Sequence, residues 1–412
     1  MSTKLLLFTR EFPFSTGEPY LETEIQFYDQ FDEVHIFSLS VLKKNRVRNL
    51  DIPDNVTIHP IYFLPRIMYI LGGFNVLFSK YFWKEVLLLK SSGKLSMGNL
   101  YELTIFLSRS NIESKKIKKI IQEQNLIDAN DKVILYSYRF DYSSFIASVI
   151  NVKAKNILRI SRAHGIDLYE FRHKGNYIPL RKIILEKLNI ISFISEQGQN
   201  YLCEIYPEFE NKFQVNYLGT KYLNKPMKRK QEFFIVSCSN VISIKRVPLI
   251  FEALQKINMD IKWVHFGGGN DFDNLKNLAK SARDGLNIKL TGKISNELIM
   301  EYYENNFIDL FVNVSETEGL PVSIMEAFSV GIPVIATDVG GTSEIVSNQQ
   351  NGFLLPKNIT SDVLSESITA YINLTDSEKE GFMNNASITW EKNFNAQKNY
   401  LHFVSNLLGE FK

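Results

Sequence analysis

The sequence predicts an α/β protein built from two doubly wound, parallel-sheet (Rossmann-like) domains, and three observations carry that prediction. Short runs rich in Val, Ile and Phe alternate with amphipathic helical stretches. The runs fall into two series separated by a polar segment. The 412 residues also exceed one ordinary core, because domains average roughly 150 residues. Two such domains are expected to face a cleft that binds ligands at the carboxyl ends of their strands.

Eleven apolar runs are the expected strands. The first series is Leu5–Phe8, Val34–Leu39, Val133–Tyr138, Ile157–Arg162 and Ile191–Ser195. The second series is Phe233–Ser237, Ile261–Phe266, Ile288–Thr291, Leu310–Val314, Val334–Thr337 and Phe353–Leu355. Most of the second series is continuously apolar, which is typical of strands buried on both faces of a parallel sheet.

The segment Gly219–Glu232 is polar and basic, contains Pro226 and has neither helical nor strand periodicity, so we expect the domain linker there. The expected domains are residues 1–220 and residues 221–385. Residues 386–412 are expected to form a C-terminal helix that packs back on the first domain. Its aromatic anchors would be Trp390, Phe394, Tyr400 and Phe403.

Composition excludes several classes of protein. The formal net charge of +2 and the absence of a long Lys/Arg run argue against a nucleic-acid partner. The two cysteines, Cys203 and Cys238, lack metal-ligand spacing and are expected to be buried thiols in a reducing compartment. The N-terminus has no secretory apolar run, and the longest uncharged apolar tract, Ile67 to Ser79, is 13 residues, too short to span a bilayer. These features predict a cytoplasmic protein.

The most informative stretch runs from Val314 to Val346, VSETEGLPVSIMEAFSVGIPVIATDVGGTSEIV. A buried strand leads into a polar turn with Gly319 and Leu320, and Pro321 fits the first helical position, where its missing N–H costs nothing. Gly331 is expected to end that helix. The free amides at the helix start and the helix dipole favour an anion, and a diphosphate suits that position.

Two carboxylates flank this expected anion site. Glu318 lies just before the helix and Glu326 about a turn and a half inside it. An ionised carboxylate accepts strong hydrogen bonds from neutral hydroxyls, so one could hold a sugar and the other a ribose. Two glycines in the segment 340–344 provide a second close backbone approach. The alternative is ordinary strand-turn-helix punctuation with solvated glutamates.

The segment EGLPVSIMEAFSVGIPVIATDVGGTSEIV resembles the donor-binding signature of family 4 glycosyltransferases, retaining enzymes of the two-Rossmann GT-B architecture. The resemblance implies that Glu318 contacts the donor sugar and that Glu326 contacts the ribose of the nucleotide. It extends across most of the chain and implies a hexosyltransferase-type enzyme that uses a nucleotide-sugar donor. It also implies that residues 1–220 bind the acceptor and residues 221–385 bind the donor.

The segment VSCSNVISIKRVPLI, residues 236–250, is similar to the family's strand-loop-helix that binds the donor diphosphate. Lys245 matches the family's lysine. Asn240 stands where the family has an arginine, so one expected phosphate ligand is missing, and Arg246 is a candidate to replace it. Gly268, in the triplet 267–269, resembles a turn on the nucleotide side. The alternative for Lys245 is a solvated lysine at a helix start.

In the first domain, SRAHGIDLYEF resembles the family's His-Gly-x-Asp element. The resemblance implies that His164 contacts the donor sugar, and that Asp167 either orders the loop or approaches the acceptor. A loop around Gly17, followed by Glu22, resembles the family's acceptor-facing glycine loop. A structural histidine and a plain first-turn loop are the alternatives.

The triplet Asp271–Asp273 matches an Asp-x-Asp metal motif of another glycosyltransferase fold, but it precedes a helical run, where Asp is expected to cap the helix. We therefore expect no metal and no cofactor, with Lys245 and helix amides stabilising the leaving diphosphate. Catalysis is assigned to donor activation by Lys245, with Glu318 and His164 orienting the sugar. No residue is identified as a covalent nucleophile.

Two segments combine lysines with apolar residues and could lie on an anionic membrane surface: residues 66–90 and 114–121. Each could equally be a core helix with a solvated face. Peripheral attachment at the inner face of the cell membrane would suit an acceptor on a lipid diphosphate.

The leading hypothesis is therefore a retaining glycosyltransferase that moves a sugar from a UDP- or GDP-sugar to a glycan or lipid-linked acceptor in surface polysaccharide biosynthesis. One alternative is a nucleotide-sugar epimerase or hydrolase of the same fold. The other is a catalytically inactive nucleotide-sugar-binding partner subunit, which the missing arginine at Asn240 favours.

Overall fold

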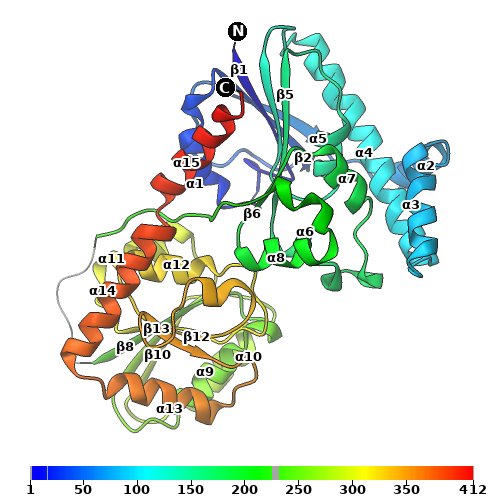
Figure 1. The fold of residues 1–412 in the computed structure, drawn as a ribbon. Coiled ribbons are helices and arrows are strands. Elements are labelled where there is room, and N and C mark those ends of the chain that lie inside the picture. The colour runs from blue at the N-terminus through cyan, green and yellow to red at the C-terminus, as the bar shows by residue number, and fades with distance from the viewer. Residues whose placement is uncertain (1, 16, 225–231, 412) are drawn as a thin grey trace. The chain divides into compact units, whose positions relative to one another are not determined.

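The computed structural model describes residues 2–15, 17–224 and 232–411, and the chain divides into two compact units (Figure 1). Unit 1 comprises residues 1–216 and 400–412, and unit 2 comprises residues 217–399. Much of the expected linker, residues 225–231, lies outside the described residues. The C-terminal segment returns to unit 1 at Tyr400, whereas the sequence placed the start of that segment at residue 386.

Unit 1 contains a parallel sheet of seven strands in the order β3-β2-β1-β4-β5-β6-β7. The strands are β1 (Thr3–Thr9), β2 (Glu33–Val41), β3 (Val56–Tyr62), β4 (Lys132–Ser137), β5 (Asn156–Ala163), β6 (Ile190–Phe193) and β7 (Phe213–Val215).

The helices of unit 1 lie in the connections between these strands, except between β2 and β3, where the described chain has none. The α-helices are α1 (Leu21–Glu24), α2 (Arg66–Val76), α3 (Lys80–Ser91), α4 (Met97–Glu123), α5 (Tyr142–Val149), α6 (Gly165–Leu168), α7 (Arg181–Lys187) and α8 (Glu196–Ile205). The 3-10 helices are η1 (Ile25–Gln30), η2 (Glu170–Arg172), η3 (Lys174–Asn176) and η4 (Pro207–Lys212).

Two edge strands of unit 1 were not predicted from the sequence. β3 contains Pro60, alternates between more and less buried residues, and pairs with β2 alone among the described strands. A proline is tolerated on such an edge strand, although its presence argues against a strand in the sequence. β7 is three residues long and therefore too short to give a periodic signal.

Unit 2 contains a parallel sheet of six strands in the order β10-β9-β8-β11-β12-β13, which confirms the second predicted series. The strands are β8 (Phe233–Cys238), β9 (Ile261–Phe266), β10 (Leu286–Leu290), β11 (Leu310–Asn313), β12 (Val334–Thr337) and β13 (Gly352–Leu355). The helices are η5 (Ser243–Lys245), α9 (Val247–Leu254), α10 (Phe272–Ala279), α11 (Asn296–Asn305), α12 (Val322–Ser329), η6 (Gly340–Glu344), α13 (Ser361–Ile372) and α14 (Asp376–Asn393).

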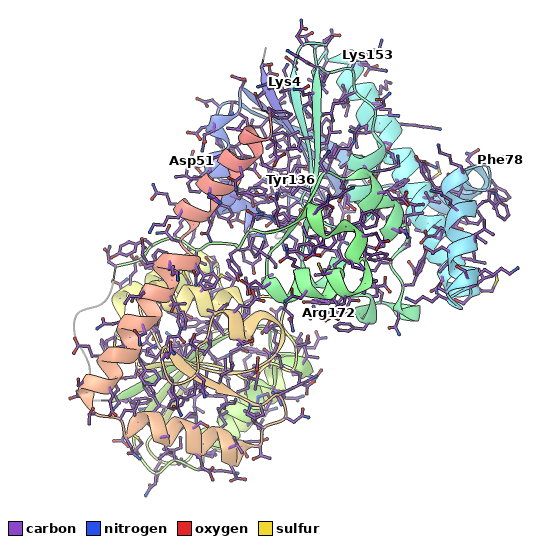
Figure 2. All side chains as sticks on the ribbon, viewed as in Figure 1. Lys4, Asp51, Phe78, Tyr136, Lys153 and Arg172 are labelled. Carbon is purple, nitrogen blue, oxygen red and sulfur yellow. The ribbon has the colours of Figure 1, made fainter. Side chains whose placement is uncertain are left out.

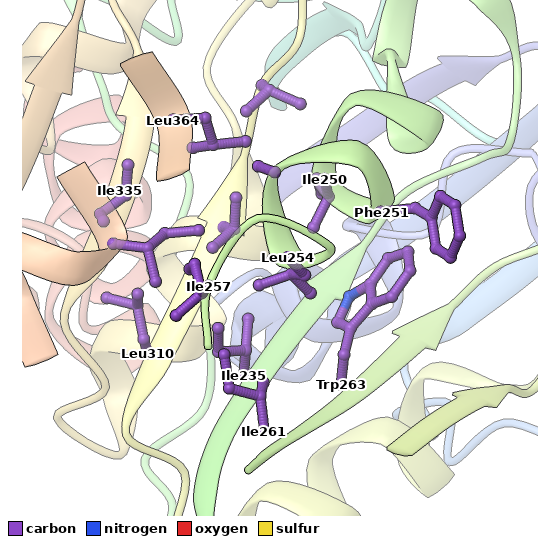
Figure 3. Packing of buried hydrophobic residues seen from close by; sticks show 14 of the residues in the cluster. Ile235, Ile250, Phe251, Leu254, Ile257, Ile261, Trp263, Leu310, Ile335 and Leu364 are labelled. Atoms are coloured by element: carbon purple, nitrogen blue, oxygen red, sulfur yellow. The ribbon is translucent and has the colours of Figure 1, made fainter. Parts of the chain in front are cut away.

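The core of unit 2 lies between its sheet and the helices α9 and α13 (Figure 3). Ile250 and Leu254 of α9 pack against Ile235 of β8 and Trp263 of β9, and all four side chains are buried. The indole of Trp263 donates a hydrogen bond to Ser237 Oγ at 3.0 Å, so its polar atom is satisfied inside the core. This packing fixes the ends of β8 and β9, from which two of the loops described below emerge.

The C-terminal helices connect the two units. Trp390 of α14 donates from Nε1 to Thr220 Oγ1 at 2.7 Å within unit 2, and Phe394 is fully buried there. The last helix, α15 (Ala396–Gly409), continues into unit 1, where the ring of Tyr400 packs at a tilt against that of Phe27, with 5.8 Å between the ring centroids. Phe403 lies over the guanidinium of Arg162 at 4.4 Å. The fold class predicted from the sequence is therefore confirmed, including its return to the first unit.

Candidate functional site

The strand order of unit 2 reverses between β8 and β11, and the loops after these two strands hold the candidate site. In doubly wound sheets, ligands bind outside the carboxyl ends of the strands at such a reversal. The loop after β8 contains η5 and ends with Lys245, and the loop after β11 contains Glu318. Lys245 Nζ donates to Glu318 Oε1 at 2.6 Å. Two residues singled out 73 positions apart in the sequence are thus in direct contact.

Glu318 is positioned from the last residue of β11. The side-chain amide of Asn313 donates to Glu318 Oε1 at 3.3 Å, and its oxygen accepts from the Ser315 hydroxyl at 2.7 Å and the Ser315 amide at 3.1 Å. Asn313 therefore holds both the turn and the carboxylate. The sequence did not identify it, although a polar residue at the end of a buried apolar run was the available signal.

Helix α12 begins one residue later than predicted. Pro321 is the N-cap with extended backbone angles, φ −75° and ψ 96°, and the first helical residue is Val322. The first-turn amides of a helix have no acceptor four residues earlier, so the start of α12 presents N–H donors beside Glu318. Gly331 follows the helix at φ 74°, a left-handed conformation that suits glycine, and confirms the predicted end of the helix.

The turn of η6 packs directly on the backbone before α12. Gly341 N donates to Gly319 O at 2.7 Å, and a Cβ at Gly340 would lie 2.2 Å from the Glu318 carbonyl oxygen. Gly340 also has φ 59°. A side chain there would push the two loops apart, so glycine is required for this close approach. Leu320 is buried at the same contact, where it supports Gly341.

Glu326 is buried inside α12, with 9% of its surface exposed. Its Oε1 accepts a hydrogen bond from Asn296 Nδ2 of α11 at 2.8 Å. Burial raises the pKa of Glu326 to about 7, and the bond from Asn296 opposes that rise. In the described part of the chain, Glu326 has no ion pair that would offset its burial. The sequence predicted the carboxylate but did not identify Asn296, which no local motif marks.

Asn240 and Gly268 lie on two loops that contact each other through their backbones. The amide of Val241 donates to Gly268 O at 3.0 Å. A Cβ at Gly267 would lie 1.9 Å from the Ser239 carbonyl oxygen, and its φ is 137°, which only glycine adopts readily. Asn240 itself is exposed at this contact. The glycine triplet therefore allows the loop after β9 to approach the loop after β8 closely.

Arg246 adjoins Lys245 but its guanidinium is engaged by the backbone. Nε donates to Val314 O at 2.7 Å, and Nη2 lies 2.8 Å from Lys357 O and 3.5 Å from Ser315 O. These contacts tie the loop after β8 to the loops after β11 and β13. The observed role of Arg246 is thus to hold the loops that carry Lys245 and Glu318.

In unit 1, His164 and Asp167 form one arrangement at the end of β5. Asp167 accepts from the His164 amide at 3.0 Å and from the Phe140 amide at 2.6 Å, which makes it the residue that orders this loop. His164 Nε2 lies 3.1 Å from Tyr138 O. Burial, with the nearby guanidiniums of Arg139 and Arg162, holds the pKa of His164 well below its usual range. The ring is therefore neutral, with Nε2–H donating and Nδ1 an acceptor.

Gly17 and Glu22 are connected through one arginine. Arg48 donates from Nη2 to Gly17 O and forms an ion pair with Glu22. Nearby, Glu18 is buried and accepts the amides of Arg10, Glu11 and Phe12 at 3.0 to 3.1 Å. The loop after β1 is therefore held largely by Glu18, which the sequence did not single out.

Within the described residues, no group of three or more His, Cys, Asp and Glu side chains is arranged to hold a metal ion. Asp271 lies at the N-cap of α10 without a side-chain capping hydrogen bond, and Asp273 pairs with Lys276 at 3.4 Å. The Asp-x-Asp triplet is thus at a helix start, as expected, although the predicted capping bond is absent.

The candidate residues of unit 2 lie in a part of the chain that matches a family model. Residues 220–388 match the family model of glycosyl transferases group 1. The chain is similar to N-acetyl-alpha-D-glucosaminyl L-malate synthase of Bacillus anthracis, with 22% identity over 62% of this chain and 68% of that protein. It is also similar to a putative teichuronic acid biosynthesis glycosyltransferase, TuaC, of Bacillus subtilis, with 29% identity over 37% of this chain and only 35% of that protein.

Solved structures share the fold over nearly the whole chain. A lipopolysaccharide outer core galactosyltransferase, WaaB, in its apo form superposes with a TM-score of 0.66 at 14% identity, covering 100% of both chains. The Anabaena protein HepE in complex with UDP and glucose superposes with a TM-score of 0.62 at 15% identity, covering 99% of both chains. These likenesses place the architecture in the GT-B class.

Proposed function

We propose that this chain, a member of the glycosyl transferases of group 1 through residues 220–388, is a retaining family 4 enzyme of hexosyltransferase type that transfers a sugar from a UDP- or GDP-sugar. The acceptor is a glycan or a lipid-diphosphate-linked glycan, and the reaction belongs to surface polysaccharide assembly at the cytoplasmic face of the membrane. The likeness to a putative teichuronic acid biosynthesis glycosyltransferase supports this class of acceptor.

The contact between Lys245 and Glu318 carries the proposal. It lies at the reversal of the strand order, next to the amides at the start of α12. The ammonium has three N–H donors, and Glu318 engages one of them, so Lys245 can also bind a phosphate oxygen. As the sugar–phosphate bond breaks, charge accumulates on the diphosphate, and the ammonium and helix amides stabilise it. Glu318 then orients the sugar through its hydroxyls.

Glu326 is proposed to bind the nucleotide ribose. A buried carboxylate supported by one amide donor is a strong acceptor for the two ribose hydroxyls when it is ionised. In unit 1, His164 is proposed to contact the donor sugar as a neutral ring, and Asp167 holds its backbone. Gly17 and Glu22 are proposed to lie on the acceptor side.

The proposed transfer uses no metal ion, because Lys245 and the first amides of α12 supply the positive charge at the leaving group. Addition of EDTA should therefore leave turnover unchanged within twofold. Retention of configuration is checked by proton NMR of the newly formed product, whose anomeric coupling should match that of the donor sugar.

Two variants test the assignment. Glu318→Ala should depress turnover by at least about a hundredfold with little change in donor affinity, as expected for a group used mainly in the transition state. Glu326→Ala should weaken donor binding by about tenfold, measured by calorimetry with a panel of UDP- and GDP-sugars. The matched control is Glu316→Ala, an exposed carboxylate in the same loop. Unchanged affinity and turnover in the Glu318/Glu326 double variant would sink the assignment.

A catalytically inactive partner subunit is the second candidate, because Asn240 replaces the expected arginine and Arg246 is engaged by three backbone carbonyls. That candidate predicts donor binding without transfer to any of a broad set of acceptors. An epimerase or hydrolase would instead convert the donor in the absence of acceptor. Donor binding, acceptor-free conversion and transfer, measured on the same preparation, separate the three functions.

A further inference from the structure

Helix α2 of unit 1 packs on α4 through glycines and exposes most of its large apolar residues. Val76 at its end is buried in the core, but the rest of its inward face packs closely on α4: a Cβ on Gly72 would lie 2.4 Å from Ser108 Oγ, and one on Gly73 would lie 2.9 Å from a Thr104 methyl. Tyr69 is buried on the same side, and its carbonyl accepts from Ser108 Oγ at 2.6 Å. The glycines thus bring α2 close to α4, while most of the large apolar residues of α2 are exposed.

We call that outer surface the α2–α3 face and define it by Ile67, Leu71, Phe74, Phe78, Trp83 and Leu87, all exposed. Ile67, Leu71 and Phe74 follow one another at helical spacing, so they form one stripe along α2. Phe78 is 90% exposed and Phe74 is 71% exposed. Figure 1 shows α2 and α3 at the outer edge of unit 1, and Figure 2 shows Phe78 at the outer end of this helix pair. A helix on the surface of a globular protein normally turns large apolar residues toward the core.

A hydrogen bond at the corner between α2 and α3 holds the two helices together. The indole Nε1 of Trp83 donates to Leu77 O at 2.8 Å, which fixes the corner between α2 and α3. On its inner side, α3 buries Phe82, Leu89 and Glu85, and Glu85 accepts from the Leu180 amide at 2.9 Å. The apolar residues that α3 exposes are therefore additional to those its packing requires.

The charges around this surface point to the partner. Lys80, Lys84 and Lys90 lie on α3 and are exposed, although Lys84 also lies 3.7 Å from Glu186. From residue 66 to residue 101 the only carboxylate in the sequence is Glu85, and it is buried. An apolar surface with exposed cations and no exposed carboxylate along this stretch is complementary to anionic headgroups above a hydrocarbon layer. Tryptophan also favours that interface.

Residues 114–121, the second lysine-rich segment, do not share these properties. Ile117 and Ile121 of α4 are buried in the core of unit 1, so this stretch exposes lysines without apolar residues. In the described part of the chain, no helix has the length and apolar character needed to cross a bilayer. An attachment through α2 and α3 would therefore lie in the interface plane.

We propose that the α2–α3 face inserts into the surface of an anionic lipid bilayer and holds the protein there as a peripheral membrane protein. Phe74 and Phe78 enter the boundary between headgroups and acyl chains, while Lys80 and Lys90 contact lipid phosphates. The attachment requires no donor or acceptor, so it stands apart from the proposed transfer reaction.

The test is co-sedimentation of the full chain with vesicles of pure phosphatidylcholine and of an equimolar mixture of phosphatidylglycerol and phosphatidylcholine. The protein should bind the anionic vesicles, and raising the salt should weaken binding because the lysine contribution is screened. The double variant Phe74→Glu/Phe78→Glu should lower the partition coefficient by at least about tenfold. The matched control, Ile388→Glu, introduces the same charge at an apolar residue of α14 in unit 2 that is 63% exposed.

Far-ultraviolet circular dichroism and size-exclusion chromatography check that the variants fold. No binding of the unmodified chain to anionic vesicles would overturn the proposal, as would equal binding by the double variant. A second copy of the chain is the rival occupant. It predicts a dimer that the double variant converts to a monomer with no vesicle binding by either, and that outcome also overturns the proposal. Vesicle binding without sugar transfer would leave this inference intact and contradict the proposed activity.

Discussion

The two sheets reverse their strand order at equivalent places, and each reversal carries an ion pair, but the surroundings differ. In unit 1, between β1 and β4, Arg10 donates to Asp141 from Nε at 2.8 Å and from Nη2 at 2.7 Å. Asp141 also accepts from the amide and hydroxyl of Ser143. In unit 2, between β8 and β11, Lys245 pairs with Glu318, while Glu326 of α12 has burial without a cation.

The hydrogen-bond partners of these carboxylates differ, and the difference separates carboxylates that stabilise loops from a carboxylate that could bind a ligand. Asp141 and Glu18 of unit 1 accept backbone amides that would otherwise be unpaired, so their charges stabilise the loops. Glu326 loses its water contacts on burial and accepts one hydrogen bond, from the side-chain amide of Asn296, so burial raises its pKa. A group whose environment opposes its charge is a candidate for function, which supports the role proposed for Glu326.

The largest expected effect belongs to unit 1. Glu18→Ala removes the acceptor of three amides, at Arg10, Glu11 and Phe12, and should lower the free energy of unfolding by about 3 to 5 kcal/mol. Urea titration measures this change as a shift of the unfolding transition of unit 1. The control is Glu22→Ala. The Glu22 side chain is 39% exposed in its ion pair with Arg48, so its loss should lower the free energy of unfolding by less than about 1 kcal/mol. Equal losses in both variants would contradict the structural role of Glu18.

The second effect has the opposite sign. Because folding raises the pKa of Glu326, its contribution to stability is complete below the usual carboxyl pKa of about 4.5 and is lost as the pH rises through about 7. Glu326→Gln cannot ionise, so at pH 8 it should be more stable than the unmodified chain by about 3 kcal/mol, and the gain should vanish below about pH 4.5.

The same variant should bind the donor more weakly, which makes stability and binding change in opposite directions. Thermal unfolding across pH 4.5 to 8, with and without nucleotide sugar, provides both quantities. A loss of stability at pH 8 would show that ionised Glu326 belongs to the structural carboxylates, as Glu18 does, and would remove the contrast between the two units.

The sequence predicted the architecture better than the contacts between distant segments. Apolar runs and the glycine–proline turn were enough for the five central strands of the first sheet, the six strands of the second and the end of α12, because burial and backbone conformation act locally. Residues that position others were missed: Asn313 and Asn296 act through contacts between segments far apart or around a turn. Arg246 shows the same limit, since only the folded loops reveal that backbone carbonyls engage its guanidinium.

The smallest expected effect tests such a positioning residue. Asn296→Ala removes the hydrogen bond that opposes the rise in the pKa of Glu326, so that pKa should move above 7. If ionised Glu326 binds the ribose, donor affinity increases with pH, and the midpoint of that increase should shift to higher pH in the variant. At pH 7 the loss of affinity should be about fivefold, near 1 kcal/mol.

Calorimetric titration of donor across pH 6 to 9 measures the shift. The control is Asn305→Ala, because Asn305 lies on the same helix and donates to the Glu301 carbonyl at 2.8 Å, not to Glu326. Recovery of affinity at high pH distinguishes loss of charge tuning from a damaged helix, which would weaken binding equally at every pH. A flat difference would therefore assign Asn296 to the packing of α11 and leave the raised pKa of Glu326 without a part in donor recognition.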